Sequence, residues 1–402
     1  MKPFSFVHVA DLHLGYAQYN LDARRQDFNR TFGEIVEKTL ELEPDFIIIA
    51  GDIFQHARPS NIILENAITN FRRLKDTAIP VLTVDGSHDS APNVITGTIL
   101  TPLDSAGLLH YLPRHEGASW RNESCYVYGI PNFRTRKRTE DSLPAIIEHN
   151  KPEPDPSLFN VFVFHMALDL PDVTPPQMEA EARPELIPEG FNYYAGGHIH
   201  KPYEMPFKNG LLVYSGCTET VSYEDAEVEK GFYHVEVNQK GVPKLNRIRL
   251  ETPRKFIILK HDYTGSTPKK ITETAVKTVK RADEPGAVIV PVLQGTLPAE
   301  AKRGEIDLSK IRGAAEKALH VHPLLQLRET EVSEEVIRSI FRGELKDLRT
   351  KAYEYFIQIF SERYTSEKAE EIVKLAIDLI EPLVGKDETK VKENLEAFSG
   401  ES

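Results

Sequence analysis

Aspartate and histidine recur at five points of the sequence, each directly after an apolar run. The five points are Asp11-Leu12-His13, Gly51-Asp52, Ser87-His88-Asp89, His165 and Gly197-His198-Ile199-His200. Imidazole combined with carboxylate suits Mn²⁺, Fe²⁺ or Zn²⁺ better than a site of oxygen ligands alone would. A carboxylate that bridges two such ions, about 3.5–4 Å apart, would hold them ready for in-line phosphoryl chemistry. The residue types therefore indicate metal-assisted chemistry on a phosphate ester, provided that the fold brings the five points together.

The first 250 residues alternate strand-like and helix-like segments. Continuous apolar runs predict strands at residues 4–10, 46–50, 80–84, 124–130, 160–165, 193–196, 211–214 and 231–237. Apolar residues at helical spacing predict helices over residues 28–40 and 60–75. Such alternation is typical of an α/β layered fold. Because ligands of open α/β sheets bind beyond the carboxyl ends of the strands, we expect the five polar points to form one shared site.

The character of the sequence changes near residue 255. A strand–helix–strand–helix–strand order is expected, with elements at residues 255–261, 269–282, 287–294, 308–319 and 324–332, which predicts a small separate domain. From about residue 333 onward the chain is highly charged and helical in pattern. We therefore expect three parts, covering residues 1–254, 255–332 and 333–402.

Composition excludes several classes of protein. The chain has 402 residues, of which 40% are apolar, so it can build a core but is too long for one ordinary domain. It contains no run of 18 apolar residues, so we expect no membrane segment. The net charge of −12 disfavours a protein that grips nucleic acid by bulk positive charge, although metal ions and a local basic patch could carry such a contact. Two cysteines, Cys125 and Cys217, and no CxxC motif favour a reducing cytoplasm.

Taken in order, the five points resemble the calcineurin-like metallophosphoesterase superfamily. A finer resemblance is to the DNA double-strand-break repair nucleases, called SbcD in bacteria and meiotic-recombination (Mre) nucleases in archaea and eukaryotes. Three stretches carry it: Asp11–Gly15, Gly51–Phe54 followed by Arg58-Pro59-Ser60, and Tyr194–Pro202 followed by Tyr214-Ser215-Gly216. The resemblance implies an α/β fold, a calcineurin-like metallophosphoesterase β-sandwich flanked by helices, with a small α+β capping domain and a helical C-terminal tail.

The resemblance also implies a role for each polar residue. Two divalent metal ions would be bound, and Mn²⁺ is the ion we expect. Asp11, His13 and His200 would hold the first ion, His165 and His198 would hold the second, and Asp52 would bridge both. His88 would face the scissile phosphate, either as a general acid or to stabilise charge. Asp89 could orient the imidazole of His88.

Two positions depart from the family pattern. Ser87 stands where the family usually has an asparagine that binds the second ion, and the sequence leaves open whether Ser87 binds it. Gln55 stands where many relatives have a histidine that helps at the transition state, and His56 follows one residue later. Both departures bear on the strength of the second metal site and on the rate of the chemistry.

The function that the resemblance implies is a Mn²⁺-dependent exo- and endonuclease acting on DNA in double-strand-break repair. Its substrates would be double-strand ends, hairpins or single strands. The helical C-terminal region would bind an SMC-like coiled-coil ATPase of the Rad/SbcC type. A homodimer is also expected, and we expect a cytoplasmic, nucleoid-associated protein. One candidate dimer face consists of Ile62, Ile63, Ala67, Ile68 and Phe71, which could equally pack within one subunit.

Two other functions compete with this interpretation. A metallophosphoesterase for a small phosphodiester or nucleotide would use the same residues, but it would need neither the capping-like domain nor the helical tail. A catalytically weakened scaffold subunit would explain Ser87 and Gln55, but the other metal and catalytic residues are intact. The basic run Arg134–Arg138 could contact a DNA backbone or form a solvated loop.

Overall fold

The computed structural model describes residues 1–90, 97–175, 178–298 and 301–329, and residues 353, 356–357, 366–384 and 388–399 beyond them. Contacts within the chain define two units. One comprises Met1–Lys260, Thr274–Val292 and Leu308–Leu324, and the other comprises the described residues of His261–Glu273, Leu293–Asp307 and Leu325–Ser402. The three-part division with boundaries after residues 254 and 332 stays a prediction. Among the described residues, no helix combines the length and the apolar character that crossing a bilayer requires.

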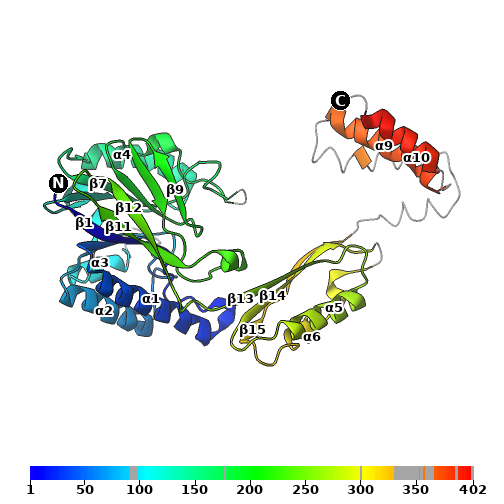
Figure 1. Cartoon of the computed structure of the whole chain (residues 1–402), viewed down its shortest axis with the longest axis horizontal. Helices are drawn as coiled ribbons and strands as arrows, with labels where there is room; N and C mark the ends of the chain where they lie inside the picture. Colours follow the sequence, from blue (N-terminus) through cyan, green and yellow to red (C-terminus); the bar gives the residue numbers. More distant parts are fainter. Residues whose placement is uncertain are drawn as a thin grey trace. The chain divides into compact units, whose positions relative to one another are not determined.

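Two six-stranded sheets form the first part of the chain (Figure 1). The first sheet has the order β12 (Pro243–Arg249), β11 (Gly231–Val237), β1 (Phe4–Val9), β2 (Phe46–Ala50), β3 (Val81–Val84) and β4 (His110–Tyr111). The second sheet has the order β5 (Ser119–Arg121), β6 (Cys125–Gly129), β7 (Phe159–His165), β8 (Tyr193–Gly197), β10 (Gly210–Tyr214) and β9 (Tyr203–Phe207). The strands predicted from continuous apolar runs lie in these two sheets.

The central strands of both sheets run parallel. In the first sheet, Ala50 at the end of β2 pairs with Val84 at the end of β3. In the second sheet, His165 at the end of β7 pairs with Gly197 at the end of β8. Because parallel strands finish at the same edge, the turns that carry the polar residues all leave from that edge.

An aromatic core joins the two sheets. The ring of Phe6 stacks on Phe46 with centroids 5.1 Å apart and meets Tyr193 of the second sheet edge-on at 5.3 Å. Offset-stacked and edge-on rings bury large apolar areas in specific orientations. Every residue of β2 is buried, as expected for a strand covered on both faces. This buried core gives the turns at the sheet edge a rigid base.

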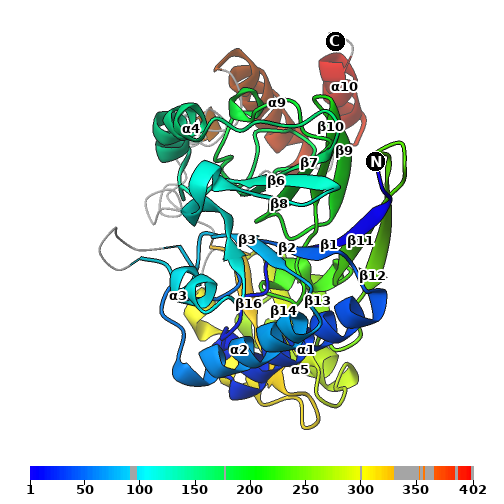
Figure 2. The ribbon, with the colours of Figure 1, turned by 90° about the vertical axis from the view of Figure 1, so that its left-hand side faces the viewer.

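Helices cover the outer faces of the sandwich (Figure 2). Three helices lie over the first sheet: α1 (Asp22–Leu42), α2 (Asn61–Asp76) and α3 (Leu100–Ser105). Successive residues of β2 point to opposite faces of the first sheet. Ile47 and Ile49 pack against these helices, whereas Ile48 faces the second sheet. Helix α4 (Arg136–Asn150) packs on the second sheet. The predicted α/β sandwich flanked by helices is therefore confirmed.

A third, four-stranded sheet follows in the sequence. It contains β13 (Phe256–Asp262), β14 (Val288–Thr296), β15 (His320–Val321) and β16 (Leu324–Arg328), with β14 pairing with the other three. The helices α5 (Pro268–Arg281) and α6 (Leu308–Arg312) alternate with these strands, and α9 (Ser366–Val384) and α10 (Glu388–Ser399) follow near the C-terminus. Six 3-10 helices complete the described elements: η1 (Gln18–Asn20), η2 (Leu112–Arg114), η3 (Glu116–Ala118), η4 (Pro184–Leu186), η5 (Tyr223–Glu227) and η6 (Arg303–Glu305).

Several expected elements differ from the structure. The basic run Arg134–Arg138 is not a loop throughout, because α4 begins at Arg136 and the Thr135 hydroxyl accepts the backbone N–H of Arg138 at its N-terminus. Helix α6 ends at Arg312, seven residues before the expected end. Strand β16 ends at Arg328, and the last residues expected in it, 330–332, lie outside the described part of the chain.

The candidate dimer face on α2 mostly belongs to the subunit's own core. Ile63, Ala67 and Phe71 are buried against the first sheet, and Ile68 packs at the edge of the same cluster. Ile62 is 64% exposed. Of the two readings of this helix face, intramolecular packing therefore accounts for four of the five residues, and the homodimer stays a proposal.

Candidate metal centre

The five polar points of the sequence meet at one edge of the sandwich. Asp11 and His13 follow β1, Asp52 follows β2, and His165 ends β7. The turns after β1 and β2 are joined by backbone hydrogen bonds, from Asp11 N–H to the Gly51 carbonyl at 3.3 Å and from His13 N–H to the Asp52 carbonyl at 3.0 Å. The Asp11 carboxylate accepts the backbone N–H of His198 at 3.1 Å, which links the two sheets.

The backbone of these turns is unusual. Four of the predicted metal-binding residues have positive φ: Asp11 at 57°, His13 at 46°, Asp52 at 50° and His198 at 87°. Left-handed backbone in residues other than glycine costs of order 1–3 kcal/mol each and clusters at functional sites. Backbone hydrogen bonds between the turns help to hold Asp11 and His13 in this conformation.

Two glycines allow the close approach of these turns. A Cβ atom on Gly86 would lie 2.1 Å from Oδ1 of Asp52, and one on Gly197 would lie 2.0 Å from the carbonyl oxygen of Ala50. Both contacts are far shorter than any non-bonded separation. The glycines next to Ser87 and His198 are therefore required by space.

The polar side chains fall into two groups that share Asp52. Potential ligand atoms of Asp11, His13 and His200, the first group, all lie within 4.8 Å of one another. Potential ligand atoms of Asp52, His165 and His198 also all lie within 4.8 Å of one another. His165 and His198 form the second group. His13 Nε2 lies 3.9 Å from both the Asp11 and the Asp52 carboxylates, and His165 Nε2 lies 3.2 Å from Asp52. Ligands about 2.0–2.2 Å from a cation are at most about 4.4 Å apart, so these separations suit shared ions.

Unpaired nitrogen atoms show that the donor set fits metal ions. Both ring nitrogens of His13 are buried without a hydrogen-bond partner. Asp11 and His165 are fully buried and Asp52 is 2% exposed. Buried charges and unpaired polar atoms are costly in an apolar interior. Divalent cations between these groups would pair the carboxylates and accept the free nitrogen lone pairs.

Burial and close neighbours shift the pKa values of several residues in the cluster. Burial lowers the pKa of His13 to about 3 and that of His198 to about 3, so both imidazoles are neutral and able to donate a lone pair. Burial acts to lower the pKa of His165 as well, but the neighbouring Asp52 carboxylate raises that pKa to about 10. Burial raises the pKa of Asp11. Without a metal ion, His165 is thus protonated and places a positive charge beside Asp52. A bound cation would take the place of that charge.

Three of the histidines are oriented by groups behind them. Nδ1 of His165 donates to the Ala50 carbonyl at 2.8 Å, and Nδ1 of His200 donates to Asp225 at 3.0 Å. Oε2 of Glu181 lies 3.5 Å from Nε2 of His198. Such outer contacts fix the imidazole tautomer and ring orientation. The sequence analysis missed Asp225 and Glu181, and the one local signal was the capping-box pattern from Ser222 to Asp225 at the start of η5.

The remaining predicted residues surround Asp52. Its carboxylate accepts the backbone N–H of His88 at 2.8 Å and the Ser87 hydroxyl at 3.3 Å. Nδ1 of His88 donates to the Gln55 carbonyl at 3.1 Å, while the side-chain Oε1 of Gln55 is buried without a partner. One ring nitrogen of His88 lies within 4.8 Å of ligand atoms of Asp52 and His13.

Asp89 has a different contact from the one expected. Its carboxylate accepts backbone N–H groups of Gly86 at 2.6 Å and Ile53 at 2.7 Å. Burial and the nearby Asp52 carboxylate raise the pKa of Asp89 to about 8. The imidazole of His88 is therefore oriented by the backbone carbonyl of Gln55 and not by Asp89. Asp89 instead joins the turn after β3 to the turn after β2.

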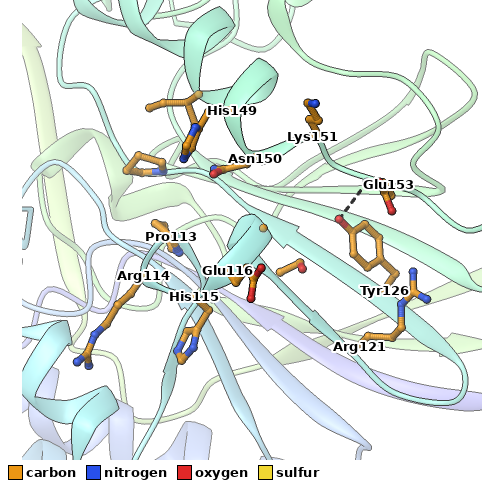
Figure 3. A pocket seen from close by; sticks show the side chains of 14 residues that line it. Pro113, Arg114, His115, Glu116, Arg121, Tyr126, His149, Asn150, Lys151 and Glu153 are labelled. Carbon is orange, nitrogen blue, oxygen red and sulfur yellow. Dashed lines mark hydrogen bonds between the residues drawn. The ribbon is translucent and has the colours of Figure 1, made fainter.

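A separate polar hollow of about 980 Å³ opens between α4 and the segment Leu112–Arg121 (Figure 3). Arg121 and Lys151 contribute positive charge, and Glu116 and Glu153 contribute negative charge. The Tyr126 hydroxyl accepts the backbone N–H of Glu153 at 3.3 Å. This mixed lining contains none of the predicted metal-binding residues, so the candidate chemistry belongs to the sheet edge and not to this hollow.

The chain matches the family model described as calcineurin-like phosphoesterase over residues 4–202. It is similar to several curated proteins named "DNA double-strand break repair protein Mre11". Identity to that of Methanocaldococcus jannaschii is 30% over 303 residues, covering 74% of this chain and 77% of the relative. Identity to that of Methanopyrus kandleri is 29% over 268 residues, covering 63% of this chain and 58% of the relative. Identity to that of Sulfolobus acidocaldarius is 24% over 400 residues, covering 98% of each chain.

Proposed function

Because the chain belongs to the Mre11 family of calcineurin-like phosphoesterases, we propose that it is a Mn²⁺-dependent DNA nuclease acting in double-strand-break repair. It hydrolyses phosphodiester bonds at DNA ends and within strands. The observation that carries the proposal is the meeting of Asp11, Asp52 and four histidines at one sheet edge, where both ring nitrogens of His13 are buried without a hydrogen-bond partner.

Two divalent ions fit the donor set. Asp11, His13 and His200 would hold one ion, His165 and His198 would hold the other, and Asp52 would serve both. When bound, such ions polarise the phosphate and lower the pKa of an attacking water. The mixture of imidazole and carboxylate suits Mn²⁺, Fe²⁺ or Zn²⁺, and the choice of Mn²⁺ among them rests on the resemblance to the family.

His88 acts on the leaving group. Its Nδ1–H donates to the Gln55 carbonyl, which fixes the ring and leaves Nε2 directed elsewhere. A proton held at Nε2 can pass to the departing 3′- or 5′-oxygen, or can stabilise negative charge on the phosphate. The group that orients His88 is the backbone carbonyl of residue 55, which is present whatever the side chain is. Gln55 in place of histidine therefore leaves the position of His88 unchanged.

DNA and a protein partner are further parts of the proposal. The net charge of −12 means that phosphate contacts depend on the ions and on local basic residues, such as those at the start of α4. The helical C-terminal region, which includes α9 and α10, binds an SMC-like ATPase by laying an apolar helix face on it. We also propose a homodimer and a cytoplasmic, nucleoid-associated location.

One assay separates this function from its two rivals. Linear double-stranded DNA and bis-p-nitrophenyl phosphate are each incubated with the full chain in Mn²⁺, with Mg²⁺ and chelator as controls. Rapid DNA degradation that requires Mn²⁺ supports the nuclease. Cleavage of the small ester with intact DNA would indicate a small-substrate phosphoesterase. Cleavage of neither would indicate a scaffold subunit.

The partner proposal has its own test. A chain that ends at residue 332 should lose co-purification with the ATPase and keep Mn²⁺-dependent nuclease activity. Retained co-purification would contradict the assignment, as would an insoluble truncated chain, because insolubility would show that the helices belong to the core.

A further inference from the structure

Glu181 is a buried carboxylate beside the metal centre that the proposed chemistry does not use. It lies in the connection between β7 and β8, on a stretch that returns to the end of β7. Leu168 and Ala182 form an isolated β-bridge there, and the backbone N–H of Glu181 donates to the Ala167 carbonyl at 2.8 Å. Glu181 is 8% exposed. Two backbone contacts therefore hold this carboxylate beside the strand end that carries His165.

The carboxylate of Glu181 has two neighbours. Oε2 accepts the backbone N–H of Ala167 at 3.1 Å and lies 3.5 Å from Nε2 of His198. His198 is the basic side chain that the described residues place within 4.0 Å of it. A buried carboxylate is costly without a charged or hydrogen-bonding partner. The backbone N–H of Ala167 and the imidazole of His198 are thus the two polar groups beside this buried carboxylate.

Two histidines of the centre, His165 and His200, share one arrangement, in which one ring nitrogen is held from behind and the other faces the cluster. His165 and His200 are held at Nδ1, by the Ala50 carbonyl and by Asp225, which leaves Nε2 for an ion. His198 is approached at the opposite nitrogen, since Glu181 lies next to Nε2. The same rule leaves Nδ1 of His198 for the second ion.

We infer that Glu181 is a positioning residue of the second metal site, which accepts the Nε2–H of His198 and so fixes the tautomer that offers Nδ1 to the ion. This inference rests on the proposed two-metal function. A carboxylate behind a metal-binding imidazole makes that imidazole a stronger donor. The second site has a neutral serine where the family has an asparagine, and Glu181 strengthens it from the outside.

Calorimetric titration of the full chain with Mn²⁺ tests the inference at equilibrium. Glu181→Ala should weaken the second site by about 10–100-fold and leave the first site unchanged. Glu181→Gln keeps an acceptor for Nε2–H without the charge, so its affinity should fall between those of Glu181→Ala and the unchanged chain. Glu185→Ala, which removes an exposed glutamate from the same connection, is the matched control and should bind as the unchanged chain does.

The tautomer of His198 provides a second readout that needs neither metal nor DNA. In the metal-free chain with ¹⁵N-labelled histidine, the His198 resonances, assigned with His198→Gln, should report a proton on Nε2. Glu181→Ala should shift that proton toward Nδ1, and Glu181→Gln should not. Failure of the nuclease assay would leave this measurement unaffected.

Three results would overturn the inference. The first is a proton on Nδ1 of His198 in the unchanged chain. The second is an equal loss of affinity at both sites in Glu181→Ala, which would indicate a structural role for the connection. The third is a Glu181→Gln variant that binds the second ion as weakly as Glu181→Ala with an unchanged tautomer, which would make Glu181 itself a ligand.

Discussion

In the first group of the metal centre, Asp11 and His13 come from one turn after β1, and His200 is fixed from behind by Asp225. Asp225, in η5, in turn accepts the backbone N–H of Ser222, the residue directly before η5, at 2.8 Å. In the second group, His165 is held by a backbone carbonyl, whereas the carboxylate beside His198 is that of Glu181, in a long connection. Both groups include Asp52, so a comparison of the two groups shows how their other residues differ.

The difference between the groups concerns charge as well as support. The first ion would have the Asp11 carboxylate to itself, and Asp225 behind His200 adds negative charge. The second ion would have the shared Asp52, a neutral Ser87 and the more distant Glu181. Fewer anionic oxygen atoms mean weaker attraction for a divalent cation. We therefore expect two unequal sites.

Asp52→Asn should have the largest effect, because it removes the charge that both groups share. If each ion loses about 10–100-fold in affinity, cleavage at limiting Mn²⁺ should fall by about 10²–10⁴-fold. Nuclease rates and Mn²⁺ stoichiometry check this, with Asp76→Asn at an exposed position of α2 as control. Loss of a single ion in Asp52→Asn would mean that Asp52 serves one group alone.

His88→Ala should lower cleavage by about 10²–10⁴-fold, the range for loss of a general acid. His88 contacts Asp52 through its backbone, so both metal affinities should stay as they are. The check pairs nuclease rates with Mn²⁺ calorimetry, and His56→Ala, at an exposed histidine, serves as control. Weaker binding of either ion in His88→Ala would reassign His88 as a ligand.

Asp225→Ala should weaken the first site alone, by about 10–100-fold, because it removes the acceptor of His200 Nδ1–H. Asp225→Asn retains an acceptor and should lose less. Calorimetry reads the two sites separately, and thermal unfolding shows whether η5 stays folded. If Asp225→Ala weakened the second site instead, the division of the centre into these two groups would be wrong.

The sequence predicts ligands that directly follow apolar strands. Asp11, Asp52 and His165 stand within two residues of a strand end, so parallel pairing alone brings them together. Asp225 and Glu181 are far from such ends in sequence and reach the centre only through tertiary packing. Glu181 lies in the connection between β7 and β8, where no periodicity in the sequence predicts which side chain turns inward.

The missed strands have a related explanation. Strands β9 and β12 lie at sheet edges, and their sequences mix charged residues and proline with apolar ones. Edge strands tolerate charge and proline, which protect them from pairing with other chains. Their apolar pattern is weak for the same reason. Helix α4 was missed because Pro144 lies inside it and breaks the helical pattern in the sequence.

Ser87→Asn should have the smallest effect, and it acts on the second metal site, which we expect to be the weaker of the two. The Ser87 hydroxyl lies 3.3 Å from Asp52 Oδ2, so it already points toward the shared carboxylate. An asparagine has a longer side chain, and its carbonyl oxygen is a ligand without the hydroxyl's need to donate a hydrogen bond. We expect the second site to tighten by up to about tenfold, within the range that a supporting group contributes.

The gain should therefore appear only when metal is limiting. At saturating Mn²⁺ both sites are filled, so the nuclease rates of Ser87→Asn and of the unchanged chain should converge. A Mn²⁺ titration by calorimetry, paired with nuclease rates over the same concentrations, measures both effects. Two equally tight sites in the unchanged chain would remove the asymmetry that motivates the substitution. A Ser87→Asn variant with unchanged metal dependence would show that residue 87 does not reach the second ion, which would leave Glu181 as its main support beyond the two histidines and Asp52.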